Sequence, residues 1–388
     1  MLLVFFLGKV LNNTLFYELK MNVIVIGAGI LGSVISYYLS IRGANVTLIE
    51  KNEPGDGASQ VSFAWINSRD KHPSEYHELN RKSVDMWSGL NNRLGNKIGL
   101  KTGGEIRWTI TDSGAVNLNK SVHLLQSTGY PVFLIDKSEL QSLEPNLISE
   151  PLTAASYSPN EMTVEPVRVI QECINLAGKS SNFELITGTE VKGFVLEKNS
   201  HIKSLITSSG EMECDYIISA VGADTTDLLS DYEVNIPRLY SPGATFFTEP
   251  VDNIFTTVSA MHSPRDRKDV LMNIRQLLDG TVQIHMGTDK FPSTSDLKYS
   301  DENVVELATQ YIPSLRGTKI VEKKQALRPM PIDGQSVIGF SEKLDNLYII
   351  MTHSGVTLAP LIGEIASIEI LEGARVDFLS NFRPGRFI

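Results

Sequence analysis

The stretch NVIVIGAGILGSVISYYLSIRGANVTLIE spans residues 22–50 and decides the fold of this chain. An apolar run leads into a glycine-rich turn, residues with helical spacing follow the turn, and a second apolar run ends at an acidic residue. This order predicts a strand, a helix and a second strand. A helical crossover makes two strands of one sheet parallel, so the segment predicts a βαβ unit.

The turn in this unit has the pattern of a dinucleotide-binding fingerprint. Gly27 allows the tight turn, Gly29 lets the backbone approach a pyrophosphate, and Gly32 lets the helix pack on the strand. The helix N-terminus faces the phosphates, and Glu50 accepts from ribose hydroxyls. An acid at position 50 disfavours a 2′-phosphate. The pattern fits NAD and FAD equally well, and the alternative is a glycine-rich turn without a ligand.

Length and composition narrow the classes of protein. A chain of 388 residues suits two domains, which can be interleaved in sequence. Thirty-five Lys and Arg against 45 Asp and Glu give a net charge of −10, which argues against a nucleic-acid partner. The spacing of Cys173 and Cys214 is not that of metal ligands, so we expect no metal site. Two cysteines are too few for a disulfide framework, so we expect a cytoplasmic location.

The first twenty residues have an apolar run of only seven residues, with no basic stretch before it and no cleavage site after it. Met21 opens directly into the first predicted strand. We therefore expect residues 1–20 to be a non-native or dispensable extension. No segment is apolar enough to cross a bilayer, so we expect no stable membrane insertion.

The rest of the chain alternates between helical and strand-like patterns, without an internal repeat. Helices are predicted at 76–94, 122–128, 164–180 and 302–315 and from about residue 357, and strands at 103–111, 183–197, 201–209, 215–223 and 347–350. Residues 236–290 are mostly strand-like, with hairpin turns.

Five motifs occur in an order that resembles the D-amino-acid oxidase superfamily of flavoproteins, which includes glycine oxidase, sarcosine oxidase and D-amino-acid dehydrogenase. They are GAGILG with TLIE (27–50), GDGAS (55–59), CDYIISAVGADT (214–225), LRPMPIDGQSVIG (327–339) and YIIMTHSGVTLAPLIGEIAS (348–367). The resemblance spans about residues 22–372. It implies an α/β chain with a Rossmann-type FAD-binding domain and an inserted, mostly antiparallel α+β substrate domain. We expect the FAD domain at 21–95, 151–235 and 320–388, and the substrate domain at 96–150 and 236–319.

The resemblance also implies which residues hold FAD. Val191 meets the adenine, Ala220 and Gly222 approach the pyrophosphate and ribitol, and a helix starting near Thr357 points its positive end at the flavin. That helix stabilises the negative charge of the reduced flavin by roughly 0.3–2 kcal/mol. The full implied set is Gly27, Ala28, Gly29, Ile30, Leu31, Gly32, Glu50, Lys51, Ala58, Ser59, Val191, Ala220, Gly222, Ser354, Gly355, Val356 and Thr357. Neither cysteine lies near HSGVT (353–357), so covalent attachment is not expected.

In the family pattern, Arg328 binds the carboxylate of an amino acid, for which a guanidinium fork is well suited. The alternative is a surface ion pair. His285 and His353 are further candidates for the catalytic site, although strand alternation leaves the face of His285 open and His353 is equally compatible with a structural role. Trp65 and Tyr240 fit cavity walls or core aromatics.

The resemblance predicts an FAD-dependent enzyme that oxidises the C–N bond of a small amino acid, D-configured, N-methylated or glycine-like. The product is an imine, formed by hydride transfer to flavin N5, and the electron acceptor is O2 or a quinone or other carrier. Two alternatives stay open: a flavin-binding protein without amine turnover, and an FAD enzyme acting on a modified tRNA base. The acidic chain lacks the basic surface that the second alternative needs.

Overall fold

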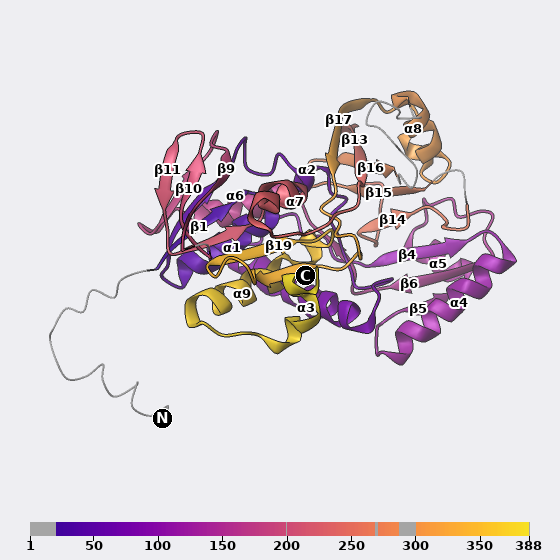
Figure 1. The fold of residues 1–388 in the computed structure, drawn as a ribbon. Coiled ribbons are helices and arrows are strands. Elements are labelled where there is room, and N and C mark those ends of the chain that lie inside the picture. Colours follow the sequence, from indigo (N-terminus) through magenta and orange to yellow (C-terminus); the bar gives the residue numbers. More distant parts are fainter. Residues whose placement is uncertain (1–20, 199, 268–270, 287–299, 388) are drawn as a thin grey trace, which may run out of the picture.

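The computed structural model describes residues 21–198, 200–267, 271–286 and 300–387 (Figure 1). The expected extension at residues 1–20 lies outside this part. Two large sheets dominate the described residues, one of six strands and one of eight. In Figure 1 the six-stranded sheet and its helices form one side of the molecule, and the eight-stranded sheet forms the other.

The six-stranded sheet has the order β18–β19–β12–β1–β2–β8. Its strands are β1 (Asn22–Ile26), β2 (Asn45–Ile49), β8 (Phe183–Ile186), β12 (Tyr216–Ser219), β18 (Val337–Phe340) and β19 (Leu347–Met351). All neighbours pair in parallel except β18 with β19. This is the Rossmann-type sheet that the first βαβ unit predicts, and the α/β fold class is confirmed.

Both faces of this sheet are buried, as continuous apolar strands require. Val23 and Val25 pack against helices on one face, whereas Ile24 and Ile26 pack under a three-stranded sheet on the other. The helices on the first side are α1 (Ile30–Ile41), α3 (Ser74–Arg93), α6 (Pro166–Ala177) and α9 (Gly355–Glu372). The smaller sheet consists of β9 (Val191–Glu197), β10 (His201–Thr207) and β11 (Gly210–Glu213). Cys173 is fully buried in α6.

The eight-stranded sheet has the order β17–β13–β16–β15–β14–β4–β6–β5. Its strands are β4 (Glu105–Thr109), β5 (Phe133–Ile135), β6 (Ala154–Ser158), β13 (Pro242–Pro250), β14 (Ala260–His262), β15 (Met272–Gln276), β16 (Thr281–Met286) and β17 (Ile320–Leu327). Only β14 and β4 run parallel. Helices α4 (Asp112–Ser127), α5 (Lys137–Leu143) and α8 (Asp301–Thr309) belong to this side (Figure 1).

Strand alternation gives this sheet one apolar face and one polar face. Ile274 and Ile284 belong to the apolar core, together with Val304 of α8. Their strand neighbours on the other face are polar: Thr245, Asn273, Gln283 and His285 are all buried or half-buried. The polar face meets the first half of the molecule, because Gln283 Nε2 donates to the carbonyl of Ser62.

Two strands shift the expected domain boundaries. β6 pairs antiparallel with β4, and β17 pairs antiparallel with β13, so both belong to the eight-stranded sheet. The expected division placed 151–235 and 320–388 with the FAD domain. A strand joins a sheet by pairing with a segment that can be distant in sequence. Local sequence patterns do not predict this pairing. We therefore propose a substrate domain that includes both strands.

Short elements connect the two halves: α2 (Ala58–Val61), β3 (Trp65–Ile66), β7 (Met162–Thr163) and α7 (Thr225–Leu229). Helix α8 ends at Thr309, earlier than predicted, because Pro313 begins a separate 3₁₀ turn. Among the described residues, no helix combines the length and apolarity needed to cross a membrane.

Candidate active site

Two positions where β1 leads into α1 admit only glycine. Gly27 has φ +97°, a conformation that L side chains rarely adopt, and a Cβ there would lie 2.7 Å from the carbonyl oxygen of Ala220. A Cβ on Gly32 would lie 1.9 Å from the carbonyl oxygen of Gly27. The helix can therefore pack against the turn only because both residues lack a side chain.

Glu50 fixes this turn from the end of β2. Its Oε2 accepts from the backbone N–H of Ala28 at 2.8 Å, and its Oε1 accepts from that of Asn52 at 3.0 Å. A carboxylate has about four lone-pair sites, so two bonds leave capacity for hydroxyl donors. The expected ribose contact is compatible with this geometry.

Helix α1 begins beside α2. Its N-cap, Gly29, makes no side-chain capping bond, and the first turn carries no acidic residue. Ile30 N–H donates to Ser59 Oγ at 3.0 Å, which places Ala58 and Ser59 against the turn. A helix start of this kind offers its remaining N–H groups and its positive end to an anion.

The carboxyl ends of β1, β2 and β12 meet at the edge of the sheet, where doubly wound folds bind dinucleotides. Ala220 N–H donates to the Ile26 carbonyl. Gly222 has φ +62°, and nearby Asp224 pairs with Lys51 at 2.6 Å. This bond raises the pKa of Lys51. Val191 is the first residue of β9 and packs at the margin of the core under this edge.

Helix α9 starts at Gly355, two residues before its expected start. A Cβ on Gly355 would lie 3.3 Å from Leu31 Cδ1, so the second turn lies beside the fingerprint helix, although more than 300 residues separate them in sequence. The N-cap Ser354 makes no capping bond; its Oγ accepts from Tyr76 at 2.8 Å and from Lys71 Nζ at 3.0 Å. The start of α9 thus presents N–H groups with a lysine beside them.

A cavity of about 310 Å³ extends from α9 to the polar face of the eight-stranded sheet. It is lined by Ala58, Val61, Ser62, Phe63, Ala64, Trp65, Asn67, Lys71, Gly243, Asn273, His285, Ala326, Leu327, Arg328, Pro329, Met330, His353, Ser354, Val356 and Thr357. Within the described chain this lining contains two cations and no carboxylate. Arg328, His285, His353 and Trp65 are therefore brought together, whereas Tyr240 is absent from the lining and 54% exposed.

A chain of hydrogen bonds orients Arg328. Its Nη2 donates to His285 Nε2 at 2.9 Å, which requires the imidazole hydrogen on Nδ1. Nδ1 then donates to Thr245 Oγ1 at 2.8 Å, and that hydroxyl donates to the Val61 carbonyl at 2.7 Å. Burial, with the charge of Arg328, lowers the pKa of His285 to about 3. His285 is thus a neutral acceptor that positions the guanidinium.

His353 also lies in the cavity wall as a neutral imidazole. Burial, together with the positive charge of Lys71, lowers its pKa to about 3. Thr357 is tied to the opposite wall, because its Oγ1 donates to the Trp65 carbonyl at 3.2 Å. The described residues contain no cluster suited to a metal ion.

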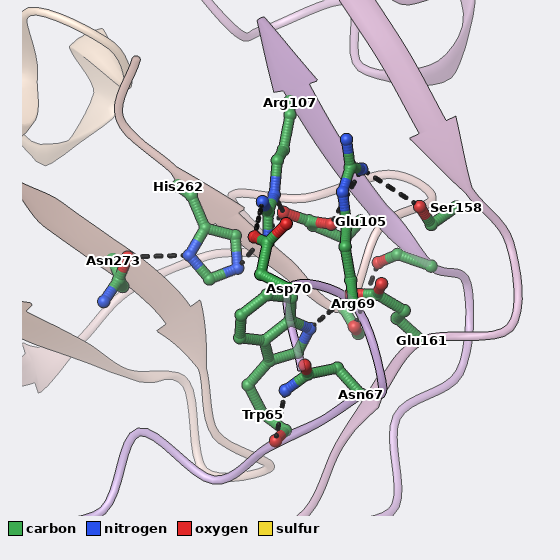
Figure 2. Close-up of polar contacts among 12 residues, drawn as sticks. Trp65, Asn67, Arg69, Asp70, Glu105, Arg107, Ser158, Glu161, His262 and Asn273 are labelled. Atoms are coloured by element: carbon green, nitrogen blue, oxygen red, sulfur yellow. Dashed lines mark hydrogen bonds and ion pairs between the residues drawn. The ribbon is translucent and has the colours of Figure 1, made fainter. Parts of the chain in front are cut away.

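Behind the cavity wall, Trp65 is held by a buried ionic cluster (Figure 2). Its indole Nε1 donates to Glu161 Oε2 at 2.5 Å, and its ring lies 4.4 Å from that of His262. Glu105 is fully buried and accepts from Arg107 Nε at 2.5 Å. Burial opposes ionisation of Glu105, yet the charge of Arg107 holds the pKa of Glu105 below its ordinary value. For Glu161, burial and the nearby charge of Glu105 raise the pKa.

Sequence reasoning missed Lys71, Asn273 and this cluster. A signal existed for the pair Glu105 and Arg107, which alternate with apolar residues in EIRWT and therefore share one face of a strand. Asn273 had no such signal, since a single polar residue in a strand does not reveal which face is buried.

Residues 22–367 match the family described as "FAD dependent oxidoreductase". The chain therefore belongs to this family, its cofactor is FAD, and it is an oxidoreductase. The resemblance to the D-amino-acid oxidase superfamily is confirmed.

Curated relatives and solved structures agree with this membership. Glycine oxidase from Geobacillus kaustophilus (strain HTA426) is 24% identical over 360 residues, covering 89% of this chain and 91% of the relative. Glycine oxidase from Pseudomonas aeruginosa is 24% identical over 349 residues, covering 87% and 92%.

The crystal structure of the Geobacillus enzyme superposes with a TM-score of 0.81 at 22% identity, covering 95% of this chain and 100% of that one. L-proline dehydrogenase from P. horikoshii gives a TM-score of 0.80 at 23% identity, with 95% and 98% coverage. At these identities, the two structures establish the shared fold.

Proposed function

We propose that this protein oxidises the C–N bond of a small amino acid, D-configured, N-methylated or glycine-like, to an imine. The observation that carries the proposal is the arginine in the cavity: Arg328, oriented by neutral His285, shares a cavity of about 310 Å³ with the start of α9. A guanidinium fork matches a carboxylate, and the two glycine oxidases among the relatives support chemistry on an amino acid.

The glycine-rich turn at the carboxyl end of the six-stranded sheet fits FAD. Gly27 and Gly32 let α1 pack against the turn after β1, because a Cβ at either position would collide with backbone, and the N-cap residues of α1 and α9 make no side-chain capping bond. We propose that FAD is held non-covalently by the residues that the motifs imply, with α1 at the pyrophosphate and α9 at the pyrimidine end of the flavin. FAD supplies the acceptor for a hydride in such a reaction.

The protein side chains bind and orient the substrate. Arg328 holds the carboxylate, and Trp65, fixed by Glu161, forms a rigid wall. Among the described lining residues, none carries a carboxylate that would keep the amine protonated. A neutral amine keeps its lone pair, which assists departure of the hydride from the adjacent carbon.

The electron acceptor in this proposal is O2 or a quinone or other carrier. Anaerobic mixing with glycine, sarcosine and D-alanine should bleach the absorbance of the bound flavin, and admitting O2 should restore it rapidly only if the protein is an oxidase. Absence of bleaching with every amino acid and amine would instead favour a flavin-binding protein without amine turnover. Reduction by none of these, but by a substrate within tRNA, would favour the second alternative.

A further inference from the structure

Four polar residues form a row across four adjacent strands. Thr245 of β13 lies opposite His285 of β16, His285 lies opposite Asn273 of β15, and Asn273 lies opposite His262 of β14. Directly opposite residues share one face of the sheet, with Cβ atoms roughly 4.5–5.5 Å apart. The row lies on the polar face that closes the cavity, and its Thr245–His285 end bonds to Arg328.

Asn273 is the member of the row whose donor is turned to the cavity. Its Oδ1 accepts from His262 Nδ1 at 2.6 Å (Figure 2). A side-chain amide presents an acceptor on one side and two donors on the other, so this bond turns the NH2 group away from His262. Asn273 is half-buried and lines the cavity, and no described residue accepts a hydrogen bond from its Nδ2.

The amide is held in place from behind. His262 is 1% exposed, packs on Trp65, and places Nε2 3.5 Å from Glu105 Oε1. Figure 2 shows the imidazole between Asn273 and Glu105. The ring is held by its burial, by its packing on Trp65 and by the bond from Nδ1 to Asn273, whereas the neutral Nε2 has no hydrogen to donate to Glu105. The Nδ2 donor is therefore preorganised toward the cavity.

We propose that Asn273 is a second carboxylate-binding residue, which donates Nδ2–H to the substrate carboxylate from the side of His285 opposite to Arg328. Arg328 bonds to His285 Nε2, and Asn273 is the neighbour of His285 across the strands, so the two donors flank one imidazole. No described lining residue carries a carboxylate that would accept from Asn273 Nδ2. The inference rests on the proposed function, since it names a further residue that grips the same substrate.

The test uses the FAD-loaded full chain and acetate as probe, with binding followed by the change in flavin absorbance. Asn273→Ala should weaken acetate binding about tenfold, because the donor is lost. Asn273→Asp has the same size but adds a negative charge, and should weaken binding about a hundredfold. Ethylamine should bind equally to the wild-type protein and to Asn273→Ala, and more tightly to Asn273→Asp. Asn303→Ala, on the exposed side of α8, is the matched control and should bind acetate like the wild type.

Acetate affinities within twofold of the wild type in both Asn273 variants would overturn the proposal, as would equal losses for acetate and ethylamine. The FAD content and the thermal midpoint identify a variant that fails to fold. If one Asn273 variant fails to fold, the acetate affinity of the other variant tests the proposal. Acetate binding needs no turnover. If the protein binds acetate but no amino acid reduces its flavin, the proposed function is refuted. The acetate affinities of the Asn273 variants still test the role of Asn273.

Discussion

At the scale of single residues, the site depends on buried groups that orient the residues lining the cavity. His285 accepts from Arg328 because Thr245 holds the imidazole hydrogen on the other nitrogen, and Glu161 fixes Trp65 in the same indirect way. Each of these supporting groups is buried, so a change in one of them leaves a polar partner without a bond.

Arg328→Ala should reduce the apparent affinity for glycine on the order of ten- to a hundredfold, because a charge-assisted bond in a partly dry cavity contributes about 1.5–3 kcal/mol. Methylamine, which lacks the carboxylate, should reduce the flavin at an unchanged rate. The measurement is anaerobic flavin reduction over a range of both substrates. Arg316→Ala, an exposed arginine, is the control. Equal losses for the two substrates would mean that Arg328 supports the fold instead.

Thr245→Val should raise KM for the amino acid severalfold while FAD content stays constant. The isosteric change removes the acceptor for His285 Nδ1–H, and the other tautomer would point an N–H at Arg328. Thr248→Val is a matched control, because Thr248 is equally buried on the same strand but accepts from the Val282 N–H and does not contact His285. It should lower stability without changing KM; a KM change of the same size there would contradict the tautomer argument.

At the scale of elements, two helix starts that are far apart in sequence meet at one place. Helix α1 follows β1 through a turn that requires glycine at position 27, and α9 follows β19 through HSGVT. Leu31 touches the start of α9, so both positive helix ends converge on the same region. Each element forms from local sequence, and the sheet order brings them together.

Two alanine substitutions should separate folding from FAD binding in the α1 turn. Gly32→Ala should yield little folded protein, because its Cβ would overlap the Gly27 carbonyl at 1.9 Å. Gly29→Ala should fold, since φ is −72° and only the movable Ser59 hydroxyl lies near, at 3.3 Å, yet it should bind FAD more weakly. Circular dichroism and flavin titration distinguish the two results. Normal FAD binding by Gly29→Ala would mean that the pyrophosphate lies elsewhere.

At the scale of the whole molecule, the cavity lies where the polar face of one sheet meets the helix starts of the other. That interface contains three histidines with lowered pKa values: about 4 for His262 and about 3 for both His285 and the half-buried His353, chiefly because of desolvation. All three are therefore neutral near pH 7. Unfolding exposes them to water, where the ordinary pKa is about 6.5.

This difference predicts a stability that falls on acidification. Between about pH 3 and pH 6.5 the unfolded chain binds more protons than the folded one, so the stabilising contribution is complete above pH 6.5 and declines as the pH drops. Each histidine contributes up to about 1.4 kcal/mol per pH unit well below its unfolded pKa. Urea midpoints at pH 7 and pH 5 measure the decline. His353→Gln should shrink it, and a pH-independent midpoint would refute the buried neutral state.

The sequence by itself determined the βαβ unit, its glycine-rich turn and the order of the family motifs. These depend on sterics and periodicity within a few residues: Gly27 has a positive φ, and a Cβ on Gly32 would collide with the Gly27 carbonyl. The sequence also identified Arg328 as a candidate, because this arginine belongs to the family motif at residues 327–339. Only the tertiary structure decided that His285 faces the cavity, that β6 and β17 join the eight-stranded sheet, and that Asn273 points its amide at the site. Strand pairing fixes these features between residues far apart in the chain, and which face of a strand is buried follows from that pairing.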